Sequence, residues 1–278
     1  MKKLILPIFI AITTSLFFSC DKIDTPIAQT VIDDVDTTST VVVRRFIMEE
    51  YTGHNCSNCP QGAAEMHRID SIYGEQIIPV SLHAGDPNFN DPQTGSGSYE
   101  TDFTTTAGDA YAIQFPPNGL PKGMVSRKNA GEGFQVNQWE SEFLALKDEA
   151  PLAEITIVNT YNATTREVTI DIETEWLLDG GTTTYKLQVG IVEDHIIDWQ
   201  LDGSTNVEFY DHRDVFRGAV NTTWGEAVST TPIGSKDNKS YTYTLNAAWN
   251  ADNCEVVAFI YKDSPDYEIM QANIKHVK

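Results

Sequence analysis

Positive charge is scarce in this chain, and that scarcity excludes one large class of partners. The 278 residues include 19 lysines and arginines against 40 aspartates and glutamates, which gives a net charge of −21. A nucleic-acid-binding surface has to be positive to displace counterions from phosphates, and an acidic surface is not attracted to anionic lipid headgroups. We therefore expect no nucleic-acid partner, no charge-driven adsorption to membranes, and a soluble, self-repelling surface.

Long hydrophobic runs are also scarce, because only residues 4–18 form one. No later stretch approaches the ~18 apolar residues that a transmembrane helix requires. The run follows two lysines and ends just before Cys20, an order typical of a bacterial lipoprotein signal. We therefore predict a signal peptide at 1–19, a lipid on Cys20 that anchors the chain to a membrane, and an acidic tether at 20–40. An ordinary secretory signal with an incidental cysteine is the alternative.

Cysteines are few, at positions 20, 56, 59 and 254. An exported chain meets an oxidising compartment, where disulfides form and persist. Once Cys20 carries lipid, Cys56 and Cys59 remain as a Cys-x-x-Cys pair. Cys254 lies in a strand-like run, and we expect it to be a buried and unreactive thiol.

The segment around the pair has the order of a thioredoxin-like βαβ unit. Residues 41–51 are predicted to form a strand, residues 56–74 a helix that a glycine ends, and residues 76–83 a second strand. At a helix start, free backbone N–H groups and the helix dipole favour a thiolate. Cys56, the outer residue, is therefore predicted to attack a partner's disulfide, and Cys59 to resolve the mixed disulfide.

Four more residues are assigned to this site. His54 is expected to add positive charge near the pair, and His83 to end the neighbouring strand on the same edge. Leu120–Pro121 precedes a short strand and is predicted to be a cis peptide bond that faces the disulfide and aligns a partner's backbone. The loop at 84–98, rich in Gly, Pro, Asn and Asp, is long enough to lie over the site.

After residue 150 the pattern changes to an alternation of apolar and polar residues at period two. Several short strands with turns between them are typical of an antiparallel, immunoglobulin-like β-sandwich. The sequence thus predicts a thioredoxin-like domain at 41–150 and a β-sandwich domain at 151–278. Residues 209–219 mix charges with aromatics and are expected to interrupt the sheet, as a structured crossover or a contact surface.

Several motifs together resemble the bacterial twenty-eight-kilodalton outer-membrane protein family. They are EEYTGHNCSNCP at 49–60, VSLHAGD at 80–86, GLPKGMV at 119–125, YDHRDVFR at 210–217 and the closing segment 257–272. The resemblance implies a membrane-anchored protein of the cell envelope, at the outer membrane, with a thioredoxin-like domain and a β domain. Members are described as surface antigens or adhesins, so the resemblance implies architecture and location rather than an activity.

Three functions are compatible with these residues. The first is thiol–disulfide exchange with protein partners, which needs no cofactor. The second is a non-catalytic binding or adhesion protein whose Cys pair is a structural disulfide. The third is a metal site of Cys56 and Cys59 with His54 or His83, which we favour least because a second pair of ligands is missing from the sequence. We therefore predict neither a metal nor a cofactor.

Overall fold

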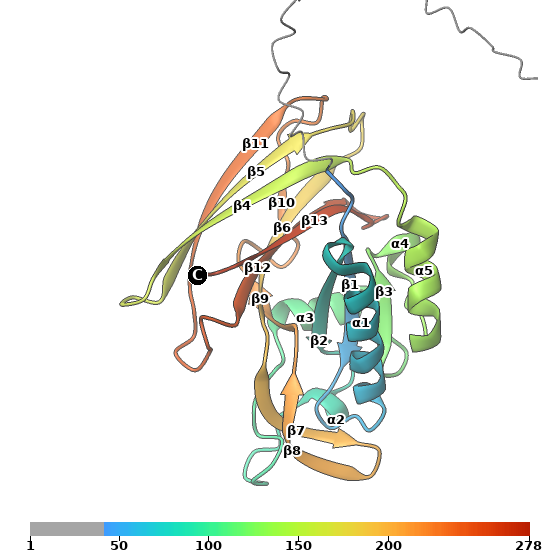
Figure 1. The fold of residues 1–278 in the computed structure, drawn as a ribbon, viewed down its shortest axis with the longest axis vertical. Helices are drawn as coiled ribbons and strands as arrows, with labels where there is room; N and C mark the ends of the chain where they lie inside the picture. The colour runs from blue at the N-terminus through green and yellow to red at the C-terminus, as the bar shows by residue number, and fades with distance from the viewer. Residues whose placement is uncertain (1–41) are drawn as a thin grey trace, which may run out of the picture. The chain divides into compact units, whose positions relative to one another are not determined.

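The computed structural model in Figure 1 describes residues 42–278. The predicted signal peptide at 1–19, the lipid-bearing Cys20 and the tether at 20–40 lie outside the described residues. Among the helices of residues 42–278, none has both the length and the apolar composition to span a bilayer.

The first half of the described chain alternates strands with helices. Its elements are β1 (Phe46–Thr52), α1 (Cys59–Tyr73), η1 (Gly74–Gln76), β2 (Ile77–His83), α2 (Pro87–Asn90), α3 (Thr106–Gln114), β3 (Lys122–Val125), α4 (Lys128–Gly131), η2 (Val136–Gln138) and α5 (Trp139–Leu146). Strands β1 and β2 are parallel, and β3 pairs antiparallel with the other edge of β1. The predicted strand–helix–strand order around the cysteines is confirmed.

Helix α1 begins next to a proline and ends at a glycine, the two residues with the most unusual backbone preferences. Pro60 lies in the first turn, where a missing N–H costs nothing because no carbonyl is there to accept from it. Gly74 ends the helix with a φ of 53°, a backbone conformation that residues other than glycine disfavour. Between them, Met66 and Ile69 are buried in an apolar cluster that also holds Phe46 of β1.

The second half consists of strands. They are β4 (Ala153–Asn162), β5 (Glu167–Trp176), β6 (Tyr185–Glu193), β7 (Ile196–Asp202), β8 (Thr205–His212), β9 (Val215–Ala219), β10 (Glu226–Ala227), β11 (Lys236–Thr244), β12 (Cys254–Lys262) and β13 (Ile269–His276). Strands β11, β5 and β4 form a three-stranded antiparallel sheet. In β4 and β5 buried residues alternate with more exposed ones, as the period-two pattern predicts. Their buried residues share one apolar core with residues of β6 and β12, which are buried along most of their length.

One mixed sheet joins the two halves. Its strand order is β13-β12-β6-β9-β2-β1-β3, and β10 also pairs with β6. The expectation that residues 209–219 interrupt the sheet is wrong, because β9 lies within it, between β6 and β2, with Val215 opposite Ser81. Val215 and Phe216 are buried, and this short apolar pair is obscured in the sequence by the charged residues around it. The sheet thus crosses the predicted boundary between 41–150 and 151–278.

A buried cation, the guanidinium of Arg127, also connects the halves. The guanidinium of Arg127 donates from Nε and Nη2 to the Glu49 carboxylate of β1, at 2.8 and 2.6 Å. Four aromatic rings surround this guanidinium at 4.6–5.9 Å, those of Tyr111, Phe115, Phe259 and Tyr261. Two of the rings come from α3 or its end and two from β12, so one cation contacts strands and helices of both halves.

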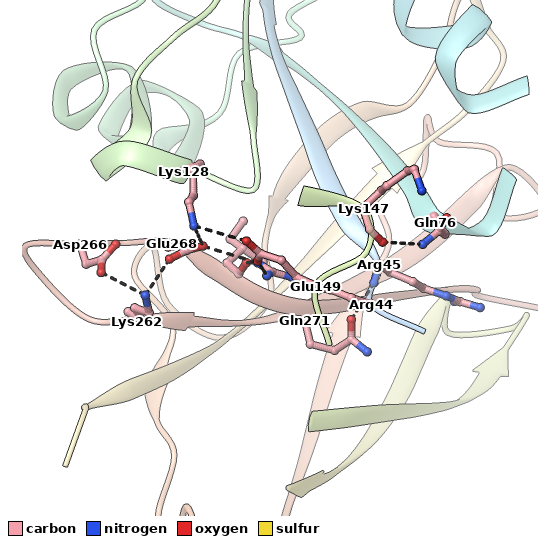
Figure 2. A network of polar contacts seen from close by, with 11 residues as sticks. Arg44, Arg45, Gln76, Lys128, Lys147, Glu149, Lys262, Asp266, Glu268 and Gln271 are labelled. Carbon is pink, nitrogen blue, oxygen red and sulfur yellow. Dashed lines mark hydrogen bonds and ion pairs between the residues drawn. The ribbon is translucent and has the colours of Figure 1, made fainter. Parts of the chain in front are cut away.

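Ion pairs also hold the start of the described chain, as Figure 2 shows. Arg44 is buried and contacts Glu149, before β4, and Glu268, before β13. Glu268 in turn pairs with Lys128 and Lys262, at 2.7 and 2.6 Å. The segment that leads to the N-terminus is thereby fastened to both halves of the fold.

We predict that Arg127→Met lowers the free energy of unfolding by about 3–5 kcal/mol, because it leaves the Glu49 carboxylate buried without its partner. Urea unfolding measures the loss. Arg68→Met is the matched control, because Arg68 pairs with Glu65 and Glu140 at the surface, where solvent screens the charges and an ion pair contributes little to stability. Equal losses for the two variants would contradict the role assigned to Arg127.

Candidate functional site

Cys56 and Cys59 form a disulfide at the start of α1, with their Cα atoms 5.4 Å apart. Cys59 is the first residue of the helix, and Cys56 belongs to the turn that precedes it. The turn is closed by hydrogen bonds from the Cys56 N–H to the Gly53 carbonyl (3.1 Å) and from the Cys59 N–H to the Cys56 carbonyl (3.2 Å). The disulfide therefore joins the turn before α1 to the first residue of the helix.

Both cysteines are buried, which differs from the expectation that Cys56 is open to partners. Cys56 is 3% exposed and Cys59 is 1% exposed. The reason lies more than 140 residues along the chain, where β7 and β8 form a hairpin against the turn (Figure 1). Four hydrogen bonds run from the hairpin to the turn: Leu201 N–H to His54 O (2.8 Å), Gly203 N–H to Ser57 O (2.9 Å), and Gln200 Nε2 to Cys56 O (3.2 Å) and to Gly53 O (3.3 Å).

The loop after β2 contacts the same turn, as its length suggested. The Asn55 N–H donates to the Phe89 carbonyl (3.1 Å), and the buried Asn90 side chain donates to the Thr52 carbonyl. Nε2 of His54 lies 3.3 Å from the Asp91 carbonyl oxygen. The turn is thus held by the hairpin and by this loop.

A small cavity of about 20 Å³ lies behind Cys59, which is room for about one water molecule. The residues that line it come from both halves: Glu50, Thr52, Cys59, Pro60, Ala63, Ser81, His83, Gln200, Tyr210, His212 and Arg213.

Glu50 is the unusual member of this lining. It is fully buried, and neither carboxyl oxygen makes a hydrogen bond to another protein group. Burial, and then the nearby Asp214 carboxylate, raise the pKa of Glu50 well above its ordinary value. Sequence reasoning missed this residue, although a glutamate in the middle of a strand buried on both faces is a signal that could have found it.

Three histidines near the disulfide, His54, His83 and His212, are buried, and burial lowers the pKa of each. Burial lowers the pKa of His54, so the expectation that it adds positive charge near the pair is wrong. Burial, and then the neighbouring His212, lower the pKa of His83 well below its ordinary value. The rings of His83 and His212 both lie against Phe103, at 4.7 and 4.9 Å between centroids. Within residues 42–278, no three His, Cys, Asp or Glu side chains are grouped to hold a metal ion.

Pro121 lies against the first turns of α1. The Leu120–Pro121 peptide bond is cis, as predicted. A β-carbon on Gly62 would approach Pro121 to 2.9 Å and would also collide with the Glu50 carboxylate, so only glycine allows this approach. Leu120 and Pro121 line an open groove beside the first turn of α1, with Asn58 among its other lining residues.

Cys254 begins β12 and is a fully buried free thiol, as expected. Burial, and then Glu193, raise its pKa to about 12, so it carries no thiolate near neutral pH.

Comparison with known proteins gives two kinds of similarity. The sequence profile of the family Outer membrane protein Omp28 matches residues 108–278, more than half of the chain. Among solved structures, HBP35 of Porphyromonas gingivalis is similar with a TM-score of 0.68 and 14% identity, over 84% of this chain and 76% of that one. A protein of Agrobacterium tumefaciens is similar with a TM-score of 0.50 and 14% identity, over 85% of this chain and 96% of its own.

A domain of the outer membrane lipoprotein Omp28 from Porphyromonas gingivalis is 22% identical, over 46% of this chain and 96% of its own, with a TM-score of 0.34. No curated protein matches the chain. The structural similarities concern the fold alone, whereas the profile match shows the family: the chain belongs to the Omp28 outer membrane protein family and is a protein of the outer membrane.

Proposed function

We propose that this outer membrane protein exchanges disulfides with protein partners through Cys56 and Cys59. The observation that carries the proposal is the unpartnered carboxyl of Glu50, which borders the same small cavity as Cys59. A purely structural disulfide needs no ionisable neighbour, and a buried polar group without a partner costs about 1–3 kcal/mol. Groups with such perturbed pKa values cluster at functional sites.

The chemistry needs a nucleophile, a resolving thiol and a place for one proton. In the reducing direction, a dithiol donor first reduces the Cys56–Cys59 disulfide and becomes a disulfide itself. The Cys56 thiolate then attacks one sulfur of a partner's disulfide, whose other sulfur leaves as a thiolate and takes a proton from water. Cys59 then gives its proton to the Glu50 side chain, in molecules where that carboxylate is ionised, and attacks Sγ of Cys56. This step releases the partner's second thiolate and forms the Cys56–Cys59 disulfide. The opposite sequence oxidises a partner dithiol.

The same proposal assigns an architecture and an anchor. Parallel strands β1 and β2 with α1 between them, and the disulfide at the helix start, support a thioredoxin-like first half. Two sheets around one apolar core support an immunoglobulin-like second half. A lipid on Cys20 would hold both at the membrane, and extended polypeptides near Pro121 would be the partners.

A second function is favoured by a different observation, the burial of both cysteines. In this alternative the protein is a binding or adhesion protein of the envelope, and the disulfide is a staple that closes the turn before α1.

Serine variants of the two cysteines separate these functions. Under exchange, wild type reduces insulin disulfides with dithiothreitol as electron donor, and Cys56→Ser abolishes this activity. Cys59→Ser accumulates mixed disulfides with envelope proteins on non-reducing gels, because no thiol resolves them. Cys254→Ser is the control and leaves exchange unchanged, because that thiol is buried. If wild type shows no exchange and the variants only lose stability, the staple function replaces the first proposal.

Glu50→Gln tests the buried acid through stability and rate together. Because the folded-state pKa of Glu50 is raised, folding opposes its ionisation, and this penalty grows as pH rises above the ordinary carboxyl range. We expect Glu50→Gln to be more stable than wild type at pH 8 by about 1–3 kcal/mol and nearly equal at pH 4, in urea unfolding. It should also slow the step in which Cys59 resolves a mixed disulfide.

Glu49→Gln is the matched control and should lose stability at pH 8, since it breaks the pair with Arg127.

A further inference from the structure

We propose that the β7–β8 hairpin is an autoinhibitory strap, which occupies the place of an extended partner strand on the disulfide turn. The inference rests on the proposed exchange function and deepens it. It assigns the partner a chemical class, a polypeptide with an extended segment beside its cysteine. It also makes access to the disulfide regulated, because that segment has to displace the hairpin.

The hairpin contacts the disulfide turn through its main chain. Leu201, near the end of β7, and Gly203, in the hairpin's own turn with a φ of 59°, donate their backbone N–H groups to the carbonyls of His54 and Ser57. Main-chain hydrogen bonds do not depend on side-chain identity, so an extended peptide bound beside the turn would donate to the same carbonyls. The hairpin thus makes the main-chain contacts that a partner strand would make.

Gln200 completes the cover. Its side chain is buried and donates to the carbonyls of Cys56 and Gly53, directly at the disulfide. A thiolate has to reach Sγ of Cys56 to exchange, and the 3% exposure of that residue leaves no room for a second chain. Exchange therefore requires the hairpin to leave.

The hairpin is built so that it can leave as a unit. Its two strands pair with each other and not with the mixed sheet. His195 and Asp214 flank it, and both have positive φ (55° and 53°), which is uncommon for residues other than glycine. Arg213 and Asp194 join the two ends of the hairpin by a bidentate ion pair at 3.0 and 3.1 Å.

Besides the four hydrogen bonds to the turn, the hairpin accepts side-chain hydrogen bonds from Tyr99 to Asn206 (2.6 Å) and from Thr101 to Asp198. A segment that is not paired with the main sheet can open at lower free energy than the core of a protein.

The test is the rate at which dithiothreitol reduces the Cys56–Cys59 disulfide in the folded protein. Gln200→Ala removes two hydrogen bonds to the turn and should speed this reduction by about tenfold. Phe209→Ser is the matched control, because Phe209 lies on the same hairpin, is 75% exposed and should leave the rate unchanged. Thermal melting of each variant establishes that it is folded.

Hydrogen exchange of the wild-type amides is the second measurement, and it decides the question if Gln200→Ala does not fold. The Leu201 and Gly203 amides should exchange at least about tenfold faster than buried amides of β12, since the strap opens without global unfolding. The strap would be overturned if the Leu201 and Gly203 amides exchanged hydrogen as slowly as the β12 amides. It would also be overturned if dithiothreitol reduced the disulfide of Gln200→Ala at the wild-type rate.

The two proposals fail in different ways. If Gln200→Ala is reduced rapidly by dithiothreitol but still does not exchange with insulin disulfides, the hairpin is a cover and the exchange function is wrong. If wild type and Gln200→Ala reduce insulin equally fast, the exchange function stands and the strap is wrong.

Discussion

The pairing of Arg127 with Glu49 is the contact on which the rest of the structure depends. A guanidinium and a carboxylate removed from water have to satisfy each other, and here four aromatic rings from both halves enclose the cation. The pair lies on the face of β1 that Ile47 and Tyr51 also bury, toward α3 and β12. Because successive residues of a strand point to opposite faces, Glu50 is directed toward α1 and the cavity beside Cys59. The paired acid and the unpaired acid thus lie on opposite faces of one strand.

The site is assembled from both halves of the chain. The cysteines and Glu50 come from the first half, whereas Gln200, Tyr210 and His212 of the cavity lining come from the hairpin. Strand β9 makes this possible, since it joins β6 to β2 within one sheet and brings the hairpin before it to the start of α1. Isolation of the first half alone would therefore expose the disulfide and remove part of its polar surroundings, which changes both its access and its electrostatics.

Local patterns predicted the elements around the disulfide well. The strand–helix–strand order, the glycine that ends α1 and the cis bond before Pro121 were all readable within a few residues. The predictions that were wrong, an open Cys56, a cationic His54 and an interrupted sheet at 209–219, each depended on a segment distant in the chain. Cys56 is covered by residues 200–203, His54 loses its charge through burial, and β9 finds its partners in β2 and β6.

By itself, the sequence determined what depends on near neighbours: the Cys56–Cys59 pair, spaced closely enough to form a disulfide, the periods of the strands, and an acidic composition unsuited to nucleic acid. The tertiary structure alone decided the burial of the disulfide, the isolation of Glu50 and the enclosure of Arg127. Burial and charge pairing arise where segments distant in the chain meet: Glu49 and Arg127 are 78 residues apart, and Gln200 and Cys56 are 144 apart. No local period or spacing encodes which segments meet.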